Sequence, residues 1–217
     1  MSTAAARGPG RFITFEGGEG AGKTTQIGRL ADWLAGRGIE VVRTREPGGT
    51  EGAEAVRALL VEGEAGRWQP LAELLLVAAA RADHLSRLIE PALARGAWVL
   101  CDRYADSTRV YQGGAGGLEP ALIDRLHEEI MQARVPDLTL LLDLPVATGL
   151  ARRHADGNGG RFEAKGAAFH EAVRRAYLEL ASAEPARIAV IDAAADADAV
   201  AGAVRCAVAD RLGLAAP

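Results

Sequence analysis

The chain has 217 residues, which is long enough for one domain with a sizeable core. Hydrophobic residues make up 49% and charged residues 25%, an ordinary balance for a soluble globular protein. The net charge of −4 excludes a global attraction to nucleic acid or to an anionic membrane, so any phosphate binding must come from local arrangements of arginine.

Neither the N-terminus nor the pattern of cysteines indicates an exported protein. Residues 1–10 lack the apolar segment of a signal peptide, and no apolar run is long enough to cross a bilayer. Cys101 and Cys206 have neither CxxC nor metal-ligand spacing, and we expect both to be inert core residues. We therefore expect a cytoplasmic protein with a flexible N-terminus over residues 1–10 and a single domain over residues 11–214.

The most specific motif is the stretch 17–24, Gly-Gly-Glu-Gly-Ala-Gly-Lys-Thr, which matches G-x-x-x-x-G-K-[ST] at every fixed position. A strand is predicted before it, over residues 11–16, and a helical apolar stripe follows from Ile27 to Leu34. This order of strand, glycine loop and helix is the context in which the motif binds the polyphosphate of a nucleotide. A chance glycine-rich turn is the alternative.

Each part of this loop has an expected task. The glycines let several backbone N–H groups converge on a phosphate, Lys23 supplies a mobile cation, and the hydroxyl of Thr24 is placed to bind Mg²⁺. The predicted nucleotide-binding residues are Gly17, Gly18, Glu19, Gly20, Ala21, Gly22, Lys23, Thr24 and Thr25.

Strands and helices alternate along the rest of the chain. Further strands are predicted at residues 39–43, 97–101, 138–142 and 188–191. Helices are predicted at 51–60, 70–94, 122–130, 169–180 and 200–212, with Pro91 ending or kinking the second and glycines 113–117 forming a loop. Apolar strands separated by helices predict an α/β fold, a five-stranded parallel sheet with helices on both faces, whose ligands bind beyond the carboxyl ends of the strands.

Charged residues follow two of these strands. After the second, the loop Thr44–Thr50 carries Arg45, whose guanidinium could grip a phosphate; an exposed surface turn is the alternative. After the third, Asp102 is placed to help hold Mg²⁺ and Arg103 to face a second phosphate, unless the two form a structural ion pair.

Two further segments complete the predicted site. Thr108 and Tyr111 share a helix face, and with Arg81 they could read the edge of a base. The arginines around the glycine-rich segment 156–160 suit a lid over residues 152–163, with an ordinary exposed loop as the alternative. Two phosphate sites and a lid favour phosphoryl transfer between nucleotides, because such a reaction must keep water out.

These segments together resemble the thymidylate kinase family. The resemblance is carried by residues 15–25, 44–50, 102–104 and 111–114 and covers almost the whole chain. It implies a P-loop nucleoside monophosphate kinase fold that phosphorylates dTMP to dTDP with ATP and Mg²⁺. It also implies a cytoplasmic homodimer with only small-molecule substrates, and no nucleic acid or membrane partner.

The same resemblance implies a role for each residue. Glu19 would meet the 3′-hydroxyl side of dTMP, and Tyr111 would pack beneath the sugar. The substrate-binding set that it implies is Glu19, Arg45, Val77, Arg81, Arg103, Thr108, Tyr111 and Gln112, with Arg45 and Arg103 on the phosphate and Arg81 and Thr108 on thymine. The implied catalytic set is Lys23, Asp102, Arg103, Arg153 and Arg161, and Thr24 and Asp102 would serve the metal.

The chain departs from the family pattern at two places. Val77 stands where members usually carry an aromatic residue that stacks on thymine, which leads us to expect weaker dTMP binding or looser choice of base. The lid has Asp156 and Gly160 at positions where the family pattern differs, so Arg153 is our first choice for the catalytic lid arginine and Arg161 the second. Another nucleoside monophosphate or deoxynucleoside kinase, or a non-catalytic nucleotide-binding regulator, are the alternative functions.

Overall fold

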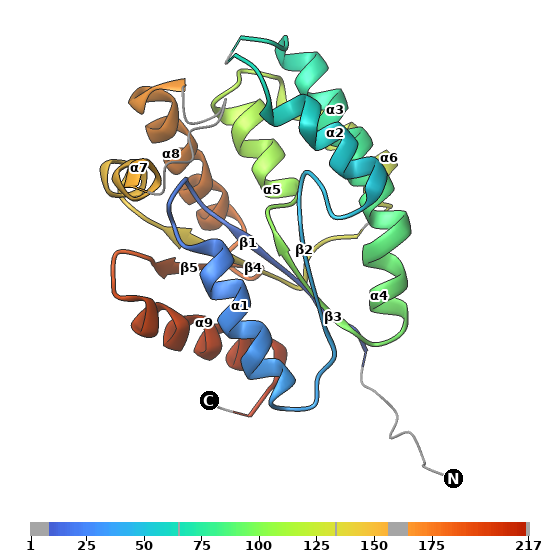
Figure 1. The fold of residues 1–217 in the computed structure, drawn as a ribbon, viewed down its shortest axis with the longest axis vertical. Coiled ribbons are helices and arrows are strands. Elements are labelled where there is room, and N and C mark those ends of the chain that lie inside the picture. The colour runs from blue at the N-terminus through green and yellow to red at the C-terminus, as the bar shows by residue number, and fades with distance from the viewer. Residues whose placement is uncertain (1–8, 65, 133, 156–164, 216–217) are drawn as a thin grey trace.

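The computed structural model describes residues 9–64, 66–132, 134–155 and 165–215 (Figure 1). Its centre is a parallel sheet with strand order β2-β3-β1-β4-β5. The strands are β1 (Phe12–Glu16), β2 (Val41–Arg45), β3 (Trp98–Asp102), β4 (Leu138–Asp143) and β5 (Ile188–Asp192). The predicted five-stranded parallel sheet is therefore confirmed. The proposed flexible N-terminus lies mostly outside the described residues and stays a prediction.

Helices cover both faces of the sheet. The α-helices are α1 (Lys23–Ala35), α2 (Glu51–Val61), α3 (Pro70–His84), α4 (Glu90–Ala94), α5 (Ala105–Thr108), α6 (Pro120–Met131), α7 (Val146–Ala155), α8 (Ala167–Ala183) and α9 (Ala197–Leu212). Along β1, Ile13 and Phe15 pack with α1 and α9, whereas Phe12 packs with the chain around α4. Figure 1 shows α1 and α9 together on one side of the sheet. None of the described helices combines the length and the apolar character needed to span a bilayer.

The long helix predicted over residues 70–94 is divided. A π-helical turn, η1 (Leu85–Ile89), separates α3 from α4, and the N–H of Glu90 donates to the carbonyl of Leu85. Proline lacks a backbone N–H and its ring crowds the preceding turn, so the helix widens just before Pro91 instead of ending there.

Three other predictions need correction, and one helix was missed. Strand β2 spans Val41–Arg45, so it begins and ends two residues later than predicted. Gly113 and Gly114 belong to a second π-helical turn, η2 (Arg109–Gly114), and only the following residues form the loop. Helix α7 was not predicted at all. Cys101 is buried as expected, but Cys206 is exposed, because it lies on the outer side of α9.

Candidate active site

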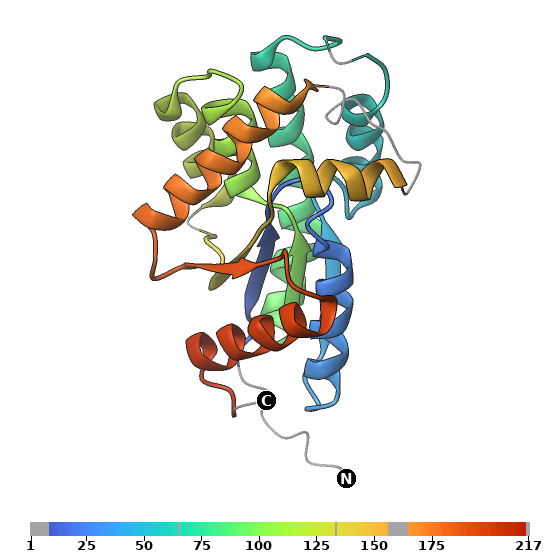
Figure 2. The ribbon, with the colours of Figure 1, turned by 90° about the vertical axis from the view of Figure 1, so that its left-hand side faces the viewer.

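The phosphate loop, residues 17–22, joins β1 to α1 at the carboxyl edge of the sheet. Two glycines are required there by close backbone contacts. A Cβ at Gly17, whose φ is 132°, would collide with the carbonyl of Leu142, and a Cβ at Gly20 would collide with the carbonyl of Gly149 in α7. Figure 2 shows α7, in gold, passing beside this loop. The loop therefore packs directly against the main chain of residues 142 and 149, which only glycine allows at these two positions.

Lys23 begins α1, and its ammonium group is folded back under the loop. Its Nζ donates to the carbonyl oxygens of Gly17 at 3.2 Å and Gly18 at 3.0 Å. The side chain is buried, and burial together with the charge of Arg103 lowers its pKa. The lysine is thus held at the centre of the loop, where an anion would meet it.

Thr24 and Asp102 meet across the start of the cleft. The hydroxyl of Thr24 lies 3.3 Å from Oδ2 of Asp102, although the two residues come from α1 and β3. Both are hard oxygen donors, and Mg²⁺ commonly takes few protein ligands and completes its shell with phosphate oxygens and water. Among the residues that the structure describes, no group of three or more His, Cys, Asp or Glu side chains is arranged to hold a metal by itself. The donor set therefore fits a Mg²⁺ that arrives with a nucleotide.

Arg103 and Glu19 form a partly buried ion pair beside the loop. Nη2 of Arg103 lies 2.7 Å from Oε1 of Glu19, and the guanidinium carbon sits 5.0 Å from the centre of the Tyr111 ring. Burial alone would raise the pKa of Glu19, but the charges of Arg103, Lys23 and Arg153 outweigh it and lower that pKa to about 2. Arg103 has φ 69°, a left-handed conformation that a non-glycine residue adopts only where its surroundings enforce it.

Arg45 reaches the same cleft but is already partnered. Its Nη2 lies 3.0 Å from Oε2 of Glu54, and its side chain is 53% exposed. Arg57 of α2, which the sequence analysis did not single out, also lines the cleft and donates to the carbonyl of Pro47 at 2.7 Å. An incoming phosphate would therefore meet two arginines on this side, with Glu54 competing for Arg45.

Arg81 is the most deeply buried arginine of the predicted set. Only 2% of it is exposed, and it donates to Glu46 at 2.7 Å and to the hydroxyl of Thr108 at 3.0 Å. Nδ1 of His84 donates to Oε1 of the same Glu46 carboxylate at 3.0 Å, because an ionised carboxylate only accepts. The guanidinium is thus fixed by protein partners while it lines the cleft.

His127 of α6 is the third partner of Arg81. Its Nε2 lies 3.1 Å from Nη1 of the arginine, and because an arginine can only donate, the imidazole accepts there and is neutral. Burial, followed by the charges of Arg81 and Arg109, lowers the pKa of His127 to about 3. Its Nδ1 has no hydrogen-bond partner among the described residues.

This histidine makes stability depend on pH. In the unfolded chain an imidazole binds its proton below about pH 6.5, whereas the folded protein resists protonation of His127 until about pH 3. The contribution of His127 to the free energy of unfolding is therefore fully present above pH 6.5. It decreases as the pH falls, by roughly 2 kcal/mol at pH 5. The free energy of unfolding is to be measured by urea titration at pH 7.5 and at pH 5. Between these two values it should fall by roughly 2 kcal/mol less in the His127→Gln variant than in wild type. Equal losses would contradict the assigned neutral form.

The predicted base-binding residues line one wall of the cleft. Val77 comes from α3, Thr108 from α5 and Gln112 from η2. Gln112 is oriented by Glu73, whose Oε1 accepts from its Nε2 at 2.8 Å. These positions agree with a base pocket, and their contacts with a base stay a prediction.

The predicted lid falls largely outside the described residues. Arg161 and segment 156–160 lie there, so the choice between Arg153 and Arg161 stays open. Arg153, at the end of α7, lines the cleft. Arg152 also lines the cleft, and it donates to the carbonyls of Gly20 at 3.5 Å and Ala193 at 3.4 Å, which connects α7 to the loop.

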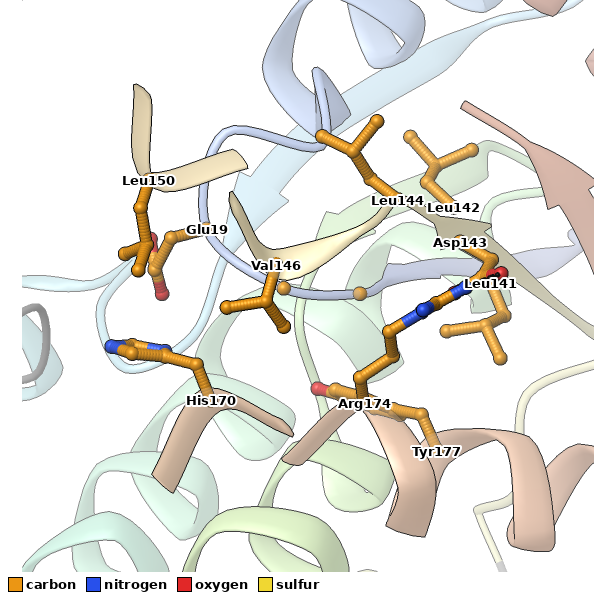
Figure 3. A pocket seen from close by; sticks show the side chains of 12 residues that line it. Glu19, Leu141, Leu142, Asp143, Leu144, Val146, Leu150, His170, Arg174 and Tyr177 are labelled. Atoms are coloured by element: carbon orange, nitrogen blue, oxygen red, sulfur yellow. Dashed lines mark hydrogen bonds and ion pairs between the residues drawn. The ribbon is translucent and has the colours of Figure 1, made fainter. Parts of the chain in front are cut away.

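One cleft of about 1350 Å³ brings most of the predicted residues together. From the predicted set it is lined by Glu19, Gly20, Ala21, Gly22, Lys23, Thr24, Thr25, Arg45, Val77, Arg81, Asp102, Arg103, Thr108, Tyr111, Gln112 and Arg153. Gly17 and Gly18 line a pocket of about 20 Å³ below the loop, where Figure 3 shows His170 and the Arg174–Asp143 pair. That pocket has room for about one water, so the large cleft is the candidate active site.

Comparisons with known proteins identify the family of this chain. The family model of thymidylate kinase matches residues 15–204. The chain belongs to the thymidylate kinase family. A curated thymidylate kinase of Caulobacter vibrioides is 58% identical over 205 residues, covering 94% of this chain and 99% of the relative. One of Chromohalobacter salexigens is 52% identical, covering 94% and 97%.

A solved structure of a thymidylate kinase supports the fold as well. The crystal structure from Ehrlichia chaffeensis shares 36% of its sequence and superimposes with a TM-score of 0.69, over 85% of this chain and 93% of that one.

In this thymidylate kinase family member, sequence reasoning missed Arg57, Glu46 and His127. A charge pattern along α2 could have indicated Arg57, but no local motif marks the other two.

Proposed function

We propose that this chain transfers the γ-phosphoryl group of ATP to dTMP and releases ADP and dTDP. The observation that carries the proposal is a single cleft lined both by the phosphate loop and by Arg45, Arg57 and Arg103. Single-ligand pockets usually measure about 300–1,000 Å³, so this larger cleft is consistent with two nucleotides. A nucleoside acceptor would not require a second cluster of arginines.

Direct in-line transfer needs only positioning and charge neutralisation from the protein. Lys23 would hold the outer phosphates of ATP, and Arg103 would hold the phosphate of dTMP. Thr24 and Asp102 would hold Mg²⁺, which neutralises phosphate charge when bound. Arg153 would bring further positive charge from α7. A covalent intermediate on the enzyme is not required.

The proposed function is tested by measuring ADP formation from Mg-ATP with dTMP, dUMP, dCMP, AMP or thymidine as acceptor. Strong stimulation by dTMP, weaker stimulation by dUMP and little by the others is the expected result. Broad use of monophosphates would indicate another nucleoside monophosphate kinase. ADP formation that no acceptor stimulates would contradict the proposal and favour an ATPase or a regulator.

Val77 should set the strength of thymine binding. A phenylalanine at this position would add a ring face for the base, worth about 1 kcal/mol, so Val77→Phe should lower the KM for dTMP about fivefold. Val77→Leu is the matched control, because it enlarges the side chain without adding a ring. A KM that is the same in both variants as in wild type would show that position 77 does not contact the base.

We also propose a cytoplasmic homodimer. Leu59 of α2 and Leu71 and Leu75 of α3 are exposed large apolar residues on neighbouring helices, which favours a covered surface. Analytical ultracentrifugation should give twice the mass of 22.7 kDa. A monomer at micromolar concentration would contradict this proposal without affecting the assignment of the site.

A further inference from the structure

Glu16 is a buried carboxylate that the reaction described above does not use. It ends β1 just before the phosphate loop and is 0% exposed. Its Oε1 accepts from the backbone N–H of Tyr104 at 2.8 Å and of Ser107 at 3.3 Å. Its Oε2 accepts from the hydroxyl of Ser107 at 2.6 Å and from that of Tyr177 at 2.7 Å. Four neutral donors thus converge on one carboxylate.

The two hydroxyls that donate to Glu16 also face Arg103. Nη1 of Arg103 lies 3.4 Å from Oγ of Ser107 and 3.3 Å from the phenol oxygen of Tyr177. Each hydroxyl has one proton, and an ionised carboxylate can only accept. The two hydroxyl oxygens also lie 2.8 Å apart, so one of them can donate to the other instead. Burial raises the pKa of Glu16 to about 7. When Glu16 is ionised and takes both protons, both oxygens turn their lone pairs to the guanidinium, which can only donate.

Glu16 holds the backbone beside Arg103 as well. The N–H that it binds belongs to Tyr104, directly after the residue with φ 69°. The N–H of Arg103 itself donates to the carbonyl of Phe15 at 2.9 Å. The end of β1 therefore fixes the main chain on both sides of the left-handed residue, while its carboxylate orients the hydroxyls around the guanidinium.

We propose that Glu16 is a positioning residue that sets the direction of the Arg103 guanidinium through the hydroxyls of Ser107 and Tyr177. For catalysis this inference rests on the proposed function, in which Arg103 holds the phosphate of the acceptor. Glu19 grips the other end of the same guanidinium, so Arg103 is held between two carboxylates, one in direct contact and one acting through hydroxyls.

Glu16→Gln is the sharpest variant, because it keeps the shape and reverses the protons. The amide nitrogen would donate to the two hydroxyls. One hydroxyl could then donate to the other, but at least one hydroxyl proton would point towards Arg103 and repel it. We expect the KM for dTMP to rise about tenfold, as for a misdirected buried hydrogen bond, while the KM for ATP stays unchanged. Equal effects on both substrates, or none, would overturn the inference.

The double variant Ser107→Ala with Tyr177→Phe tests whether the hydroxyls carry the effect. In that background Glu16→Gln should add little to the KM for dTMP, because the connection to Arg103 is already lost. A full additional tenfold rise would mean that Glu16 acts only through the backbone. Tyr177→Phe alone should raise the same KM more modestly, and it serves as the test should Glu16→Gln fail to fold.

A readout without substrate separates this inference from the proposed function. The ¹⁵N side-chain resonances of Arg103, assigned with Arg103→Lys, should shift in Glu16→Gln and in Tyr177→Phe. Unshifted resonances would overturn the inference even if dTMP is the substrate. If wild type does not use dTMP, the proposed function fails, and these resonances still decide whether Glu16 directs Arg103.

Discussion

Replacing Lys23 by alanine should reduce kcat at least about 10³-fold while the protein still folds. The ammonium group lies under the phosphate loop and donates to the carbonyls of Gly17 and Gly18, so it is positioned for a ligand. Removing one group aimed at charge that develops in the transition state typically costs a factor of 10² to 10³, and here the lysine would contact two nucleotide phosphates. Steady-state ADP formation measures the loss.

The Lys23→Met variant is the control for size. Methionine keeps an unbranched chain of similar length without the charge, so it should be as inactive as alanine. Thermal unfolding midpoints of both variants should stay close to that of wild type, because neither change leaves a buried charge unpaired. Turnover within tenfold of wild type in either variant would contradict the role assigned to Lys23.

Replacing Arg103 by alanine should lower kcat/KM for dTMP by roughly 10² to 10³ and also destabilise the protein. The variant loses the proposed phosphate contact, and it leaves Glu19 partly buried without its partner at 2.7 Å. Breaking one half of such a pair costs about 2–5 kcal/mol. Because Arg103 also depresses the pKa of Glu19, the variant should take up a proton at higher pH than wild type does.

Two variants separate the effects of this change. Arg103→Lys keeps the charge but loses the planar, two-pronged donor, so it should retain stability and recover only part of the dTMP kcat/KM. Glu19→Gln removes the unpaired carboxylate, and combined with Arg103→Ala it should restore stability without restoring activity. Should Arg103→Ala keep a wild-type KM and kcat with dTMP, Arg103 is not a phosphate ligand.

The phosphate loop and the strand ends were predictable from the sequence because their signals are local. A glycine pattern between a strand and a helix, and charged residues directly after Cys101, place Lys23, Asp102 and Arg103 without any long-range information. In the sheet, Phe15 pairs with Asp102, and Arg45 also pairs with Asp102, so the three strand ends must meet. The parallel pairing of the strands therefore places the residues that these local patterns mark at one edge of the sheet.

The remaining contacts depend on residues far apart in the sequence. His127 lies 46 positions from Arg81, and Tyr177 lies 161 positions from Glu16, so no motif links either pair. The ion pair between Arg45 and Glu54 could not be predicted for a different reason. Glu54 is only one of several acidic residues near Arg45 in the sequence. Cys206 was misplaced because an alanine-rich helix shows little difference between its inner and outer faces.

The direct contact between Gly20 and Gly149 has a consequence for protein engineering. At this contact the backbones of the phosphate loop and α7 meet directly, and a Cβ on either glycine would collide with the backbone of the other segment. A chimera that takes residues 17–24 from one relative and α7 from another would have to keep the same distance between the two backbones. No side chain lies at this contact that could change its rotamer to compensate for a different distance. Recombination points are better placed before β1 or after α7, so that both segments are inherited together, and Gly149 should be kept in any library although it lies outside every recognisable motif.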